Sequence, residues 1–367
     1  MNEMRVIIAG GGTGGHIFPA VAIGHALERM VPGVKLLFVG AMGKMEMEKV
    51  PQEGFEIVGL DIAGFNRSNM LKNLLLPFKI IKSTMQARNI LKSFKPNAVV
   101  GVGGYASFPM LRAAQGMGIP TLIQEQNSYA GKSNKILGKR AKSVCVAYEH
   151  MERFFPMEKL VMSGNPVRKK ISQSTVSREE GQAWLGLSPN KKTILIVGGS
   201  LGAKSINEAI DAHLKEIVNE GVQLIWQTGK LYYEQAKTSA AAYAGSVKVF
   251  EFIKEMDYAY AAADIVISRA GALAIAELCI VAKPVIFVPY PFAAEDHQTS
   301  NALALVEHNA ALMVKDNEAK TELVKKLKTL LHDSSMQEIM SQDLKAVAIK
   351  DADERIAKKI IEIAKKN

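Results

Sequence analysis

A chain of 367 residues is too long for one compact core and suits two domains of ordinary size. Hydrophobic residues make up 48% of it, which argues against disorder, and no apolar run approaches the about 18 residues that a membrane-spanning helix needs. The net charge of +10 favours an anionic partner, but the 7% aromatic content and the lack of a zinc-ligand spacing or an RNA-binding motif argue against nucleic acid.

Short apolar runs alternate with amphipathic stretches along the whole chain, which is typical of buried parallel strands separated by helices. The expected strands are Met4–Ala9, Lys35–Val39, Ala98–Val102, Thr121–Gln124, Ser143–Ala147, Thr193–Val197, Gln223–Gln227, Val247–Phe250, Ile265–Ser268 and Val285–Val288. We therefore expect an α/β fold with two doubly wound, Rossmann-like domains facing a central cleft. A Gly-Asn-Pro turn at 164–166 predicts the join, which gives domains over 1–164 and 165–348.

Two features bear on where the protein works. Cys145 and Cys279 each lie in an apolar run, which favours buried, reduced thiols and a cytosolic location. Residues 1–9 lead straight into a glycine turn and are too short for a signal-peptide core, so no export is expected.

Three glycine-rich turns follow expected strands and precede expected helices, at 10–15, 101–104 and 198–202. Glycine lets the backbone approach a ligand closely, and the N–H groups of a helix start attract anions, so these turns are expected to cradle phosphate. The first turn satisfies G-x-G-x-x-G, but the strand Lys35–Val39 ends without the acidic residue that a dinucleotide fingerprint requires. A nucleoside-triphosphate P-loop is also excluded, because no G-x-x-x-x-G-K-[ST] occurs.

An ordered set of motifs is more specific than any one turn. It comprises Gly11-Gly-Thr-Gly-Gly-His-Ile-Phe-Pro-Ala20, Gly101-Val-Gly-Gly-Tyr105, Gln124-Glu-Gln-Asn127, Gly164-Asn-Pro-Val-Arg168, Gly198-Gly-Ser-Leu-Gly-Ala203, Phe252-Ile253, Ser268-Arg-Ala-Gly-Ala272, Glu277, Asp296-His-Gln298 and Asp351-Ala-Asp-Glu-Arg355. In this set, which covers nearly the whole chain, the sequence resembles the MurG family, the UDP-N-acetylglucosamine (UDP-GlcNAc) transferases that act on lipid I in bacterial peptidoglycan synthesis. The resemblance implies a glycosyltransferase-B architecture whose last helix, within 349–367, returns to the N-terminal domain.

The resemblance implies that the C-terminal half binds UDP-GlcNAc. Arg168 and Ser200 would bind the diphosphate, Glu277 the ribose hydroxyls, the Ile253 backbone the uracil edge and Gln298 the sugar. Asn127, in the N-terminal half, would also bind the sugar, and the site would further be lined by Ala272, Leu273, Ala274, Ile275 and Ala276. Each residue also has an ordinary structural alternative: a helix cap for Ser200, a solvated charge for Arg168, a surface ion pair with lysine for Glu277, core for Ile253 and loop contacts for the amides.

The resemblance places the lipid-linked acceptor in the N-terminal half. Thr13, Gly14 and Gly15 would cradle the acceptor phosphates or border the donor sugar. His16 is the leading candidate for the catalytic base, with positioning of the acceptor diphosphate as the alternative. Leu201 and His297 stand where family members often carry glutamine, which puts the hydrogen bonds of those two side chains in doubt.

The implied reaction inverts the anomeric carbon without a covalent intermediate. No Asp-x-Asp cluster of the metal-dependent type was found, so neither a cofactor nor a tightly bound metal is expected, and Arg168 with the N–H groups would offset the charge of the leaving UDP. Residues 65–88 interleave apolar and basic side chains, which predicts either peripheral contact with the anionic, cytoplasmic face of the cell membrane or an ordinary core-packed helix. A transferase for another sugar or acceptor and a nonenzymatic nucleotide-sugar sensor remain alternatives.

Overall fold

The computed structural model describes residues 3–62 and 76–365. The chain divides into two compact units, residues 1–167 with 351–367 (unit 1) and residues 168–350 (unit 2). The domain boundaries expected from the sequence lie after residues 164 and 348, whereas the units of the structure change after residues 167 and 350. Arg168 is therefore the first residue of unit 2.

The described residues of unit 1 form seven parallel strands in the order β3-β2-β1-β4-β5-β6-β7. The strands are β1 (Arg5–Ala9), β2 (Lys35–Ala41), β3 (Ile57–Leu60), β4 (Ala98–Gly101), β5 (Thr121–Glu125), β6 (Ser143–Val146) and β7 (Leu160–Met162). The helices are α1 (Gly14–Met30), α2 (Glu46–Gln52), α3 (Leu76–Phe94), α4 (Ser107–Gly116), α5 (Lys132–Gly138) and α16 (Ala352–Lys365). The strand order reverses between β1 and β4, and such a switch point is where open α/β sheets bind ligands.

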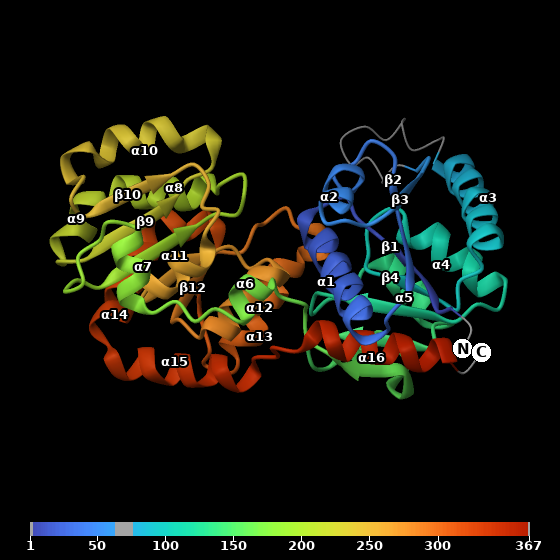
Figure 1. Cartoon of the computed structure of the whole chain (residues 1–367). Coiled ribbons are helices and arrows are strands. Elements are labelled where there is room, and N and C mark those ends of the chain that lie inside the picture. Colours follow the sequence, from blue (N-terminus) through green and yellow to red (C-terminus); the bar gives the residue numbers. More distant parts are fainter. Residues whose placement is uncertain (1–2, 63–75, 366–367) are drawn as a thin grey trace. The chain divides into compact units, whose positions relative to one another are not determined.

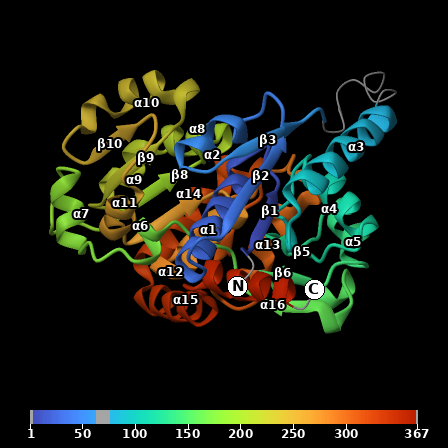
Figure 2. The same ribbon diagram turned by 45° about the vertical axis from the view of Figure 1, so that its right-hand side comes forward.

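Helices cover both faces of this sheet. One apolar cluster joins the sheet to α3, α4 and α5 through Leu91, Leu111 and Leu137. The other joins it to α1, α2 and α16, with Leu27 and Ile360 both buried in it. Figures 1 and 2 show α16, in red, beside α1, in blue, so the last helix completes the N-terminal unit.

The described residues of unit 2 form six parallel strands in the order β10-β9-β8-β11-β12-β13. The strands are β8 (Thr193–Val197), β9 (Gln223–Gln227), β10 (Val247–Phe250), β11 (Ile265–Ser268), β12 (Val285–Phe287) and β13 (Leu312–Met313). The helices are α6 (Lys169–Ser172), α7 (Arg178–Trp184), α8 (Lys204–Ala212), α9 (Leu214–Asn219), α10 (Tyr233–Ala240), α11 (Met256–Ala262), α12 (Ala272–Val281), α13 (His297–Val306), α14 (Ala319–His332) and α15 (Ser334–Val347). The switch point of this sheet lies between β8 and β11.

All ten strands expected from the sequence are present, and the expectation of two doubly wound α/β domains is confirmed. The sequence missed β3, β7 and β13, which are edge strands of four, three and two residues. All three are apolar but only two to four residues long, and so short an apolar run does not by itself distinguish a strand from other buried segments. Cys145 and Cys279 are buried free thiols, and no helix in the described ranges is long and apolar enough to cross a membrane.

Candidate active site

The first two glycine turns meet at the switch point of the first sheet. They follow β1 and β4, and their backbones touch: a Cβ added at Gly104 would lie 2.1 Å from the Gly11 oxygen, and one at Gly10 would lie 2.5 Å from the Gly103 oxygen. Gly103 and Gly104 also have φ values of +90° and +84°, in the region that favours glycine. These glycines are therefore required for the close packing of two turns.

The amide groups of residues 10–12 are used within the protein. Gly10 donates to the Val39 oxygen (3.0 Å), Gly11 to the Gly103 oxygen (3.2 Å) and Gly12 to a carboxylate oxygen of Glu46 (2.7 Å). Helix α1 begins at Gly14, and its N-cap residue Thr13 makes no side-chain cap hydrogen bond. The first N–H groups of a helix have no partner inside it, so the part of this turn that suits an anion is the helix start at 13–15.

His16 lies in the first turn of α1, beside the second glycine turn. Its Nδ1 is 3.1 Å from the Gly11 carbonyl oxygen and 3.3 Å from the Thr13 hydroxyl. A Cβ at Gly103 would come within 2.8 Å of Nε2, so only glycine there leaves room for the imidazole. The fold thus brings His16 to the switch point.

The Gln124–Asn127 motif is bound to the Gly-Asn-Pro motif. Gln124 Nε2 donates to Asn165 Oδ1, and Asn165 Nδ2 donates to the Gln126 carbonyl, both at 2.9 Å. Glu125 is buried, and its carboxylate accepts hydrogen bonds from the backbone N–H of Asn127 (3.1 Å) and from the side-chain Nδ2 of Asn134 (2.8 Å). Burial raises the pKa of Glu125, and the bond from Asn134 opposes part of that rise. These contacts hold Asn127 directly after β5.

The third glycine turn follows β8 at the switch point of the second sheet. A Cβ at Gly202, whose φ is +77°, would lie 1.8 Å from the Thr228 oxygen, so the turn packs directly on the backbone after β9. Helix α8 has Ala203 as its N-cap, which removes the helix-cap alternative for Ser200. Ser200 is exposed, and the Leu201 side chain is 86% exposed, so neither belongs to the core.

Gln227, at the end of β9, connects this turn to Ile253. Its Nε2 donates to the Gly199 oxygen (3.0 Å), and its Oε1 accepts from the Ile253 amide (2.9 Å). The Ile253 side chain is buried in the core, as in the structural alternative. A uracil contact through this backbone would use the Ile253 carbonyl or require Gln227 to move.

Arg168 and Glu277 form an ion pair within unit 2. Glu277 Oε1 lies 2.9 Å from both Nε and Nη2 of Arg168, while Tyr260 donates its hydroxyl to Oε2 at 3.1 Å. Glu277 is only 7% exposed, and burial raises the pKa of its carboxyl, an effect that Arg168 partly opposes. Glu277 is thus no surface carboxylate paired with lysine.

Helix α12 follows the end of β11 and begins with Gly271 as N-cap, without a side-chain cap bond. Ile275 is buried, so its side chain belongs to the core. The side chains of the other four residues expected to line the site are partly exposed, namely Ala272, Leu273, Ala274 and Ala276. The start of this helix therefore offers backbone N–H groups beside small side chains.

Gln298 lies in the first turn of α13. Its Oε1 accepts from the Tyr290 amide at 2.9 Å, which orients the side-chain amide so that Nε2 is the group left to donate to a ligand. His297 Nδ1 lies 2.6 Å from the Ala294 oxygen and so binds its own loop. Arg269, which the sequence analysis did not single out, contacts the Val288 (3.0 Å) and Pro289 (3.1 Å) carbonyls and pairs with Asp316, thereby holding the segment before Tyr290.

Among the described residues, no group of three or more His, Cys, Asp or Glu side chains could hold a metal ion. The sequence contains one Asp-x-Asp tripeptide, Asp351–Asp353. Asp351 pairs with Arg355 and Asp353 with Arg29, at 2.9 and 2.8 Å, so both carboxylates already have cationic partners in unit 1.

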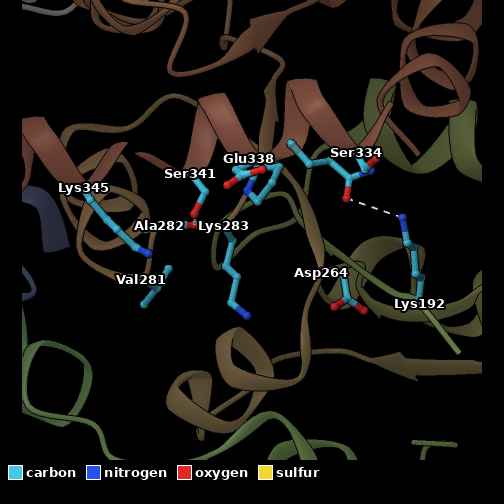
Figure 3. A pocket seen from close by; sticks show the side chains of 11 residues that line it. Lys192, Asp264, Val281, Ala282, Lys283, Ser334, Glu338, Ser341 and Lys345 are labelled. Carbon is cyan, nitrogen blue, oxygen red and sulfur yellow. Dashed lines mark hydrogen bonds between the residues drawn. The ribbon is translucent and has the colours of Figure 1, made fainter. Parts of the chain in front are cut away.

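A cavity of about 440 Å³ lies at the opposite edge of the second sheet. Lys192, Asp264 and Pro284, which line it, directly precede β8, β11 and β12, so the cavity is at the amino ends of these strands. Figure 3 shows Lys283 and Glu338 on its walls. None of the residues expected to bind the nucleotide lines this cavity, so it is not the expected donor site.

Comparison with known proteins identifies the family. Residues 6–146 match the glycosyltransferase family 28 N-terminal domain, and residues 193–356 match the C-terminal domain of the same family. The crystal structure of MurG from Acinetobacter baumannii is 32% identical, covers 98% of this chain and 99% of that one, and superposes with a TM-score of 0.80. The chain belongs to the MurG family. It is therefore a glycosyltransferase with a glycosyltransferase-B fold.

Two curated members of the MurG family match over the full length. The protein of Parabacteroides distasonis is 49% identical over 100% of both chains, and that of Phocaeicola vulgatus is 52% identical over 99% of this chain and 97% of its own. Both are named UDP-N-acetylglucosamine–N-acetylmuramyl-(pentapeptide) pyrophosphoryl-undecaprenol N-acetylglucosamine transferase.

Proposed function

We propose that this chain transfers GlcNAc from UDP-GlcNAc to the muramyl 4-hydroxyl of lipid I, which gives lipid II for peptidoglycan synthesis. The observation that carries the proposal is the full-length similarity, at about half of all positions, to transferases whose names state this donor and this acceptor. The starts of helices α8 and α12 support it, because they follow β8 and β11 at the switch point of the second sheet, and the first N–H groups of a helix can bind a nucleotide diphosphate.

The donor binds to unit 2 in this proposal. Arg168, Ser200 and the N–H groups at the start of α12 bind the diphosphate, and Gln298 Nε2 binds the sugar. Glu277 binds the ribose hydroxyls. Because both Glu277 oxygens already accept hydrogen bonds, the ribose adds to or replaces the bond from Arg168, whose side chain is 43% exposed and free to turn toward phosphate.

The acceptor binds to unit 1. The acceptor diphosphate lies at residues 13–15, while Asn127 binds hydroxyls of the donor sugar. The 4-hydroxyl oxygen attacks C1 of GlcNAc as the bond from C1 to the UDP oxygen breaks, and His16 Nε2 takes the hydroxyl proton. Arg168 and the helix N–H groups stabilise the departing UDP.

Helix α3 supports peripheral docking to the anionic, cytoplasmic face of the membrane. Residues 65–75 of the interfacial stretch lie outside the described residues. On α3, Phe78 (71% exposed), Ile81 and Met85 are exposed beside Lys79 and Lys82, while Leu91 and its neighbours pack into the core. Both expected roles of this helix therefore have support, one on each face.

Vesicle sedimentation tests the docking. Phe78→Ser with Ile81→Ser should weaken binding to phosphatidylglycerol-containing vesicles at least tenfold, since each side chain loses about 1.5–3 kcal/mol of apolar burial when fully inserted. Ile136→Ser, which alters an exposed apolar residue of α5, should leave binding unchanged. Equal binding by all three proteins would refute docking through α3.

Donor competition tests the transferase proposal against its rivals. With a lipid I analogue as acceptor, UDP-GlcNAc should be consumed far faster than UDP-GalNAc or UDP-glucose. Preference for another UDP-sugar would favour the other-transferase alternative. Saturable binding of UDP-GlcNAc without transfer to a competent acceptor would favour the sensor.

A further inference from the structure

Glu46 is a buried carboxylate beneath the first glycine turn. It is the first residue of α2 and is 1% exposed. Its Oε2 accepts the Gly12 amide at 2.7 Å, and its Oε1 accepts the Ala41 amide at 2.9 Å. Within the described residues, no Lys, Arg or His lies within ion-pair distance of it, so two backbone N–H groups are its partners.

The glycine turn is shaped around this carboxylate. A Cβ at Gly11 would lie 2.3 Å from Glu46 Cδ, and a Cβ at Gly40 would lie 2.5 Å from Glu46 Cγ. Glycine at both positions leaves the space that the Glu46 side chain fills. By accepting the Gly12 N–H, the carboxylate holds the peptide group between Gly11 and Gly12 in place.

The other side of the same peptide contacts His16. A trans peptide is planar, and its C=O and N–H point in opposite directions. The Gly12 N–H donates to Glu46, and the Gly11 C=O of that peptide lies 3.1 Å from His16 Nδ1. A carbonyl oxygen can only accept, and the Thr13 hydroxyl, 3.3 Å from Nδ1, can accept as well as donate, so the carbonyl contact places the proton of neutral His16 on Nδ1.

We propose that Glu46 is a positioning residue that sets the His16 tautomer through the Gly11–Gly12 peptide. The carboxylate orients the peptide and polarises it, which strengthens the carbonyl as an acceptor for Nδ1–H. Neutral His16 then keeps its lone pair on Nε2, the nitrogen that takes the acceptor proton. The catalytic part of this inference rests on the proposed function, whereas the tautomer does not.

The experiment measures the His16 tautomer by ¹⁵N NMR of the full chain labelled at histidine, with the His16→Gln spectrum for assignment. At a pH where His16 is neutral, the wild type should be mainly the Nδ1–H tautomer. Glu46→Gln, which keeps the shape but loses the charge and one acceptor, should raise the Nε2–H population at least threefold. Glu48→Gln removes an exposed carboxylate from the same helix and should match the wild type.

Turnover provides the second readout. Glu46→Gln should lower kcat about three- to tenfold and leave KM for UDP-GlcNAc within twofold, since general-base catalysis contributes roughly 10²–10⁴ in rate and is only partly lost. A wild type that is mainly Nε2–H overturns the inference without any variant. A variant with the wild-type tautomer overturns it too, whatever its kcat. If the wild type shows no transfer, the proposed function fails, while the tautomer result still stands on its own.

Discussion

Replacing Glu277 by glutamine should weaken nucleotide binding without unfolding unit 2. Glutamine keeps the side-chain size and one oxygen for the Tyr260 hydroxyl, but it loses the charge that faces Arg168. Two terms then offset each other in the free energy of unfolding. The ion pair is lost at a half-exposed arginine that water can solvate, and the cost of burying the Glu277 charge disappears. The net change should stay within about 1 kcal/mol.

The loss in binding is larger because it involves the ribose. A hydrogen bond to a charged group contributes about 1.5–3 kcal/mol, which corresponds to a roughly ten- to hundredfold rise in Kd for UDP. Calorimetry with UDP and with 2′,3′-dideoxy-UDP isolates this contact. The wild type should discriminate between the two ligands by about that factor, and Glu277→Gln should not.

Two further comparisons sharpen this test. Glu307→Gln, which changes an exposed carboxylate near the end of α13, should bind UDP like the wild type. Burial raises the pKa of Glu277, so its carboxyl becomes protonated at a higher pH than an exposed glutamate. As the pH falls, the wild-type Kd should therefore approach that of Glu277→Gln. A variant that still distinguishes the dideoxy ligand would refute the ribose assignment.

Other substitutions test the local structure of the site and of unit 2, each with urea unfolding as the measurement. Gly202→Ala should lower the free energy of unfolding by about 2–4 kcal/mol, because the new Cβ meets the Thr228 oxygen and the residue has a positive φ. Gly221→Ala, which also has a positive φ but open space around it, should lower the free energy of unfolding by only about 1 kcal/mol, and equal losses would contradict the close packing. Asn165→Ala should lower the free energy of unfolding by about 2–4 kcal/mol, because Gln124 and the Gln126 carbonyl lose buried hydrogen-bond partners. Asn190→Ala, at an exposed position, should change the free energy of unfolding little, and an equally small effect of Asn165→Ala would show that the bridge between the two motifs is dispensable. Hydrogen bonds from Lys328 hold the pKa values of Glu216 and Glu220 below 4.5, so the stability that these two carboxylates contribute is present above that pH and is lost as the pH falls through their folded-state pKa values. The Lys328→Met variant should therefore lose less stability than the wild type between pH 6 and pH 3, and equal losses would contradict the assigned cause.

The central strands and the turns that follow them could be predicted because their signals are local. Buried parallel strands such as Thr193–Val197 are continuous apolar runs, and residues directly after them must lie at the carboxyl edge of the sheet. This places His16, Asn127, Ser200 and the start of α12 at that edge. Leu312–Met313 also lies in an apolar run, but its two residues are too few for the run to indicate a strand, and its pairing with β12 appears only in the structure.

The partners of these residues could not be read from the sequence, because they depend on which distant segments pack together. Glu46 looks like an ordinary acid at the start of a helix, and only the packing of α2 beneath the glycine turn brings it to Gly12. Gln227 is the last residue of a strand and has no distinguishing sequence signal, yet its side chain is hydrogen-bonded to the backbones of both Gly199 and Ile253. The pairing of Arg168 with Glu277 spans 109 positions of the chain.

The most direct test of the proposed transferase is UDP release from UDP-GlcNAc by the wild-type chain, measured with and without a lipid I analogue. The proposal predicts release that requires the acceptor and forms the β-linked disaccharide lipid in equal amount. No release with a competent acceptor, while UDP-GlcNAc still binds saturably, would contradict it.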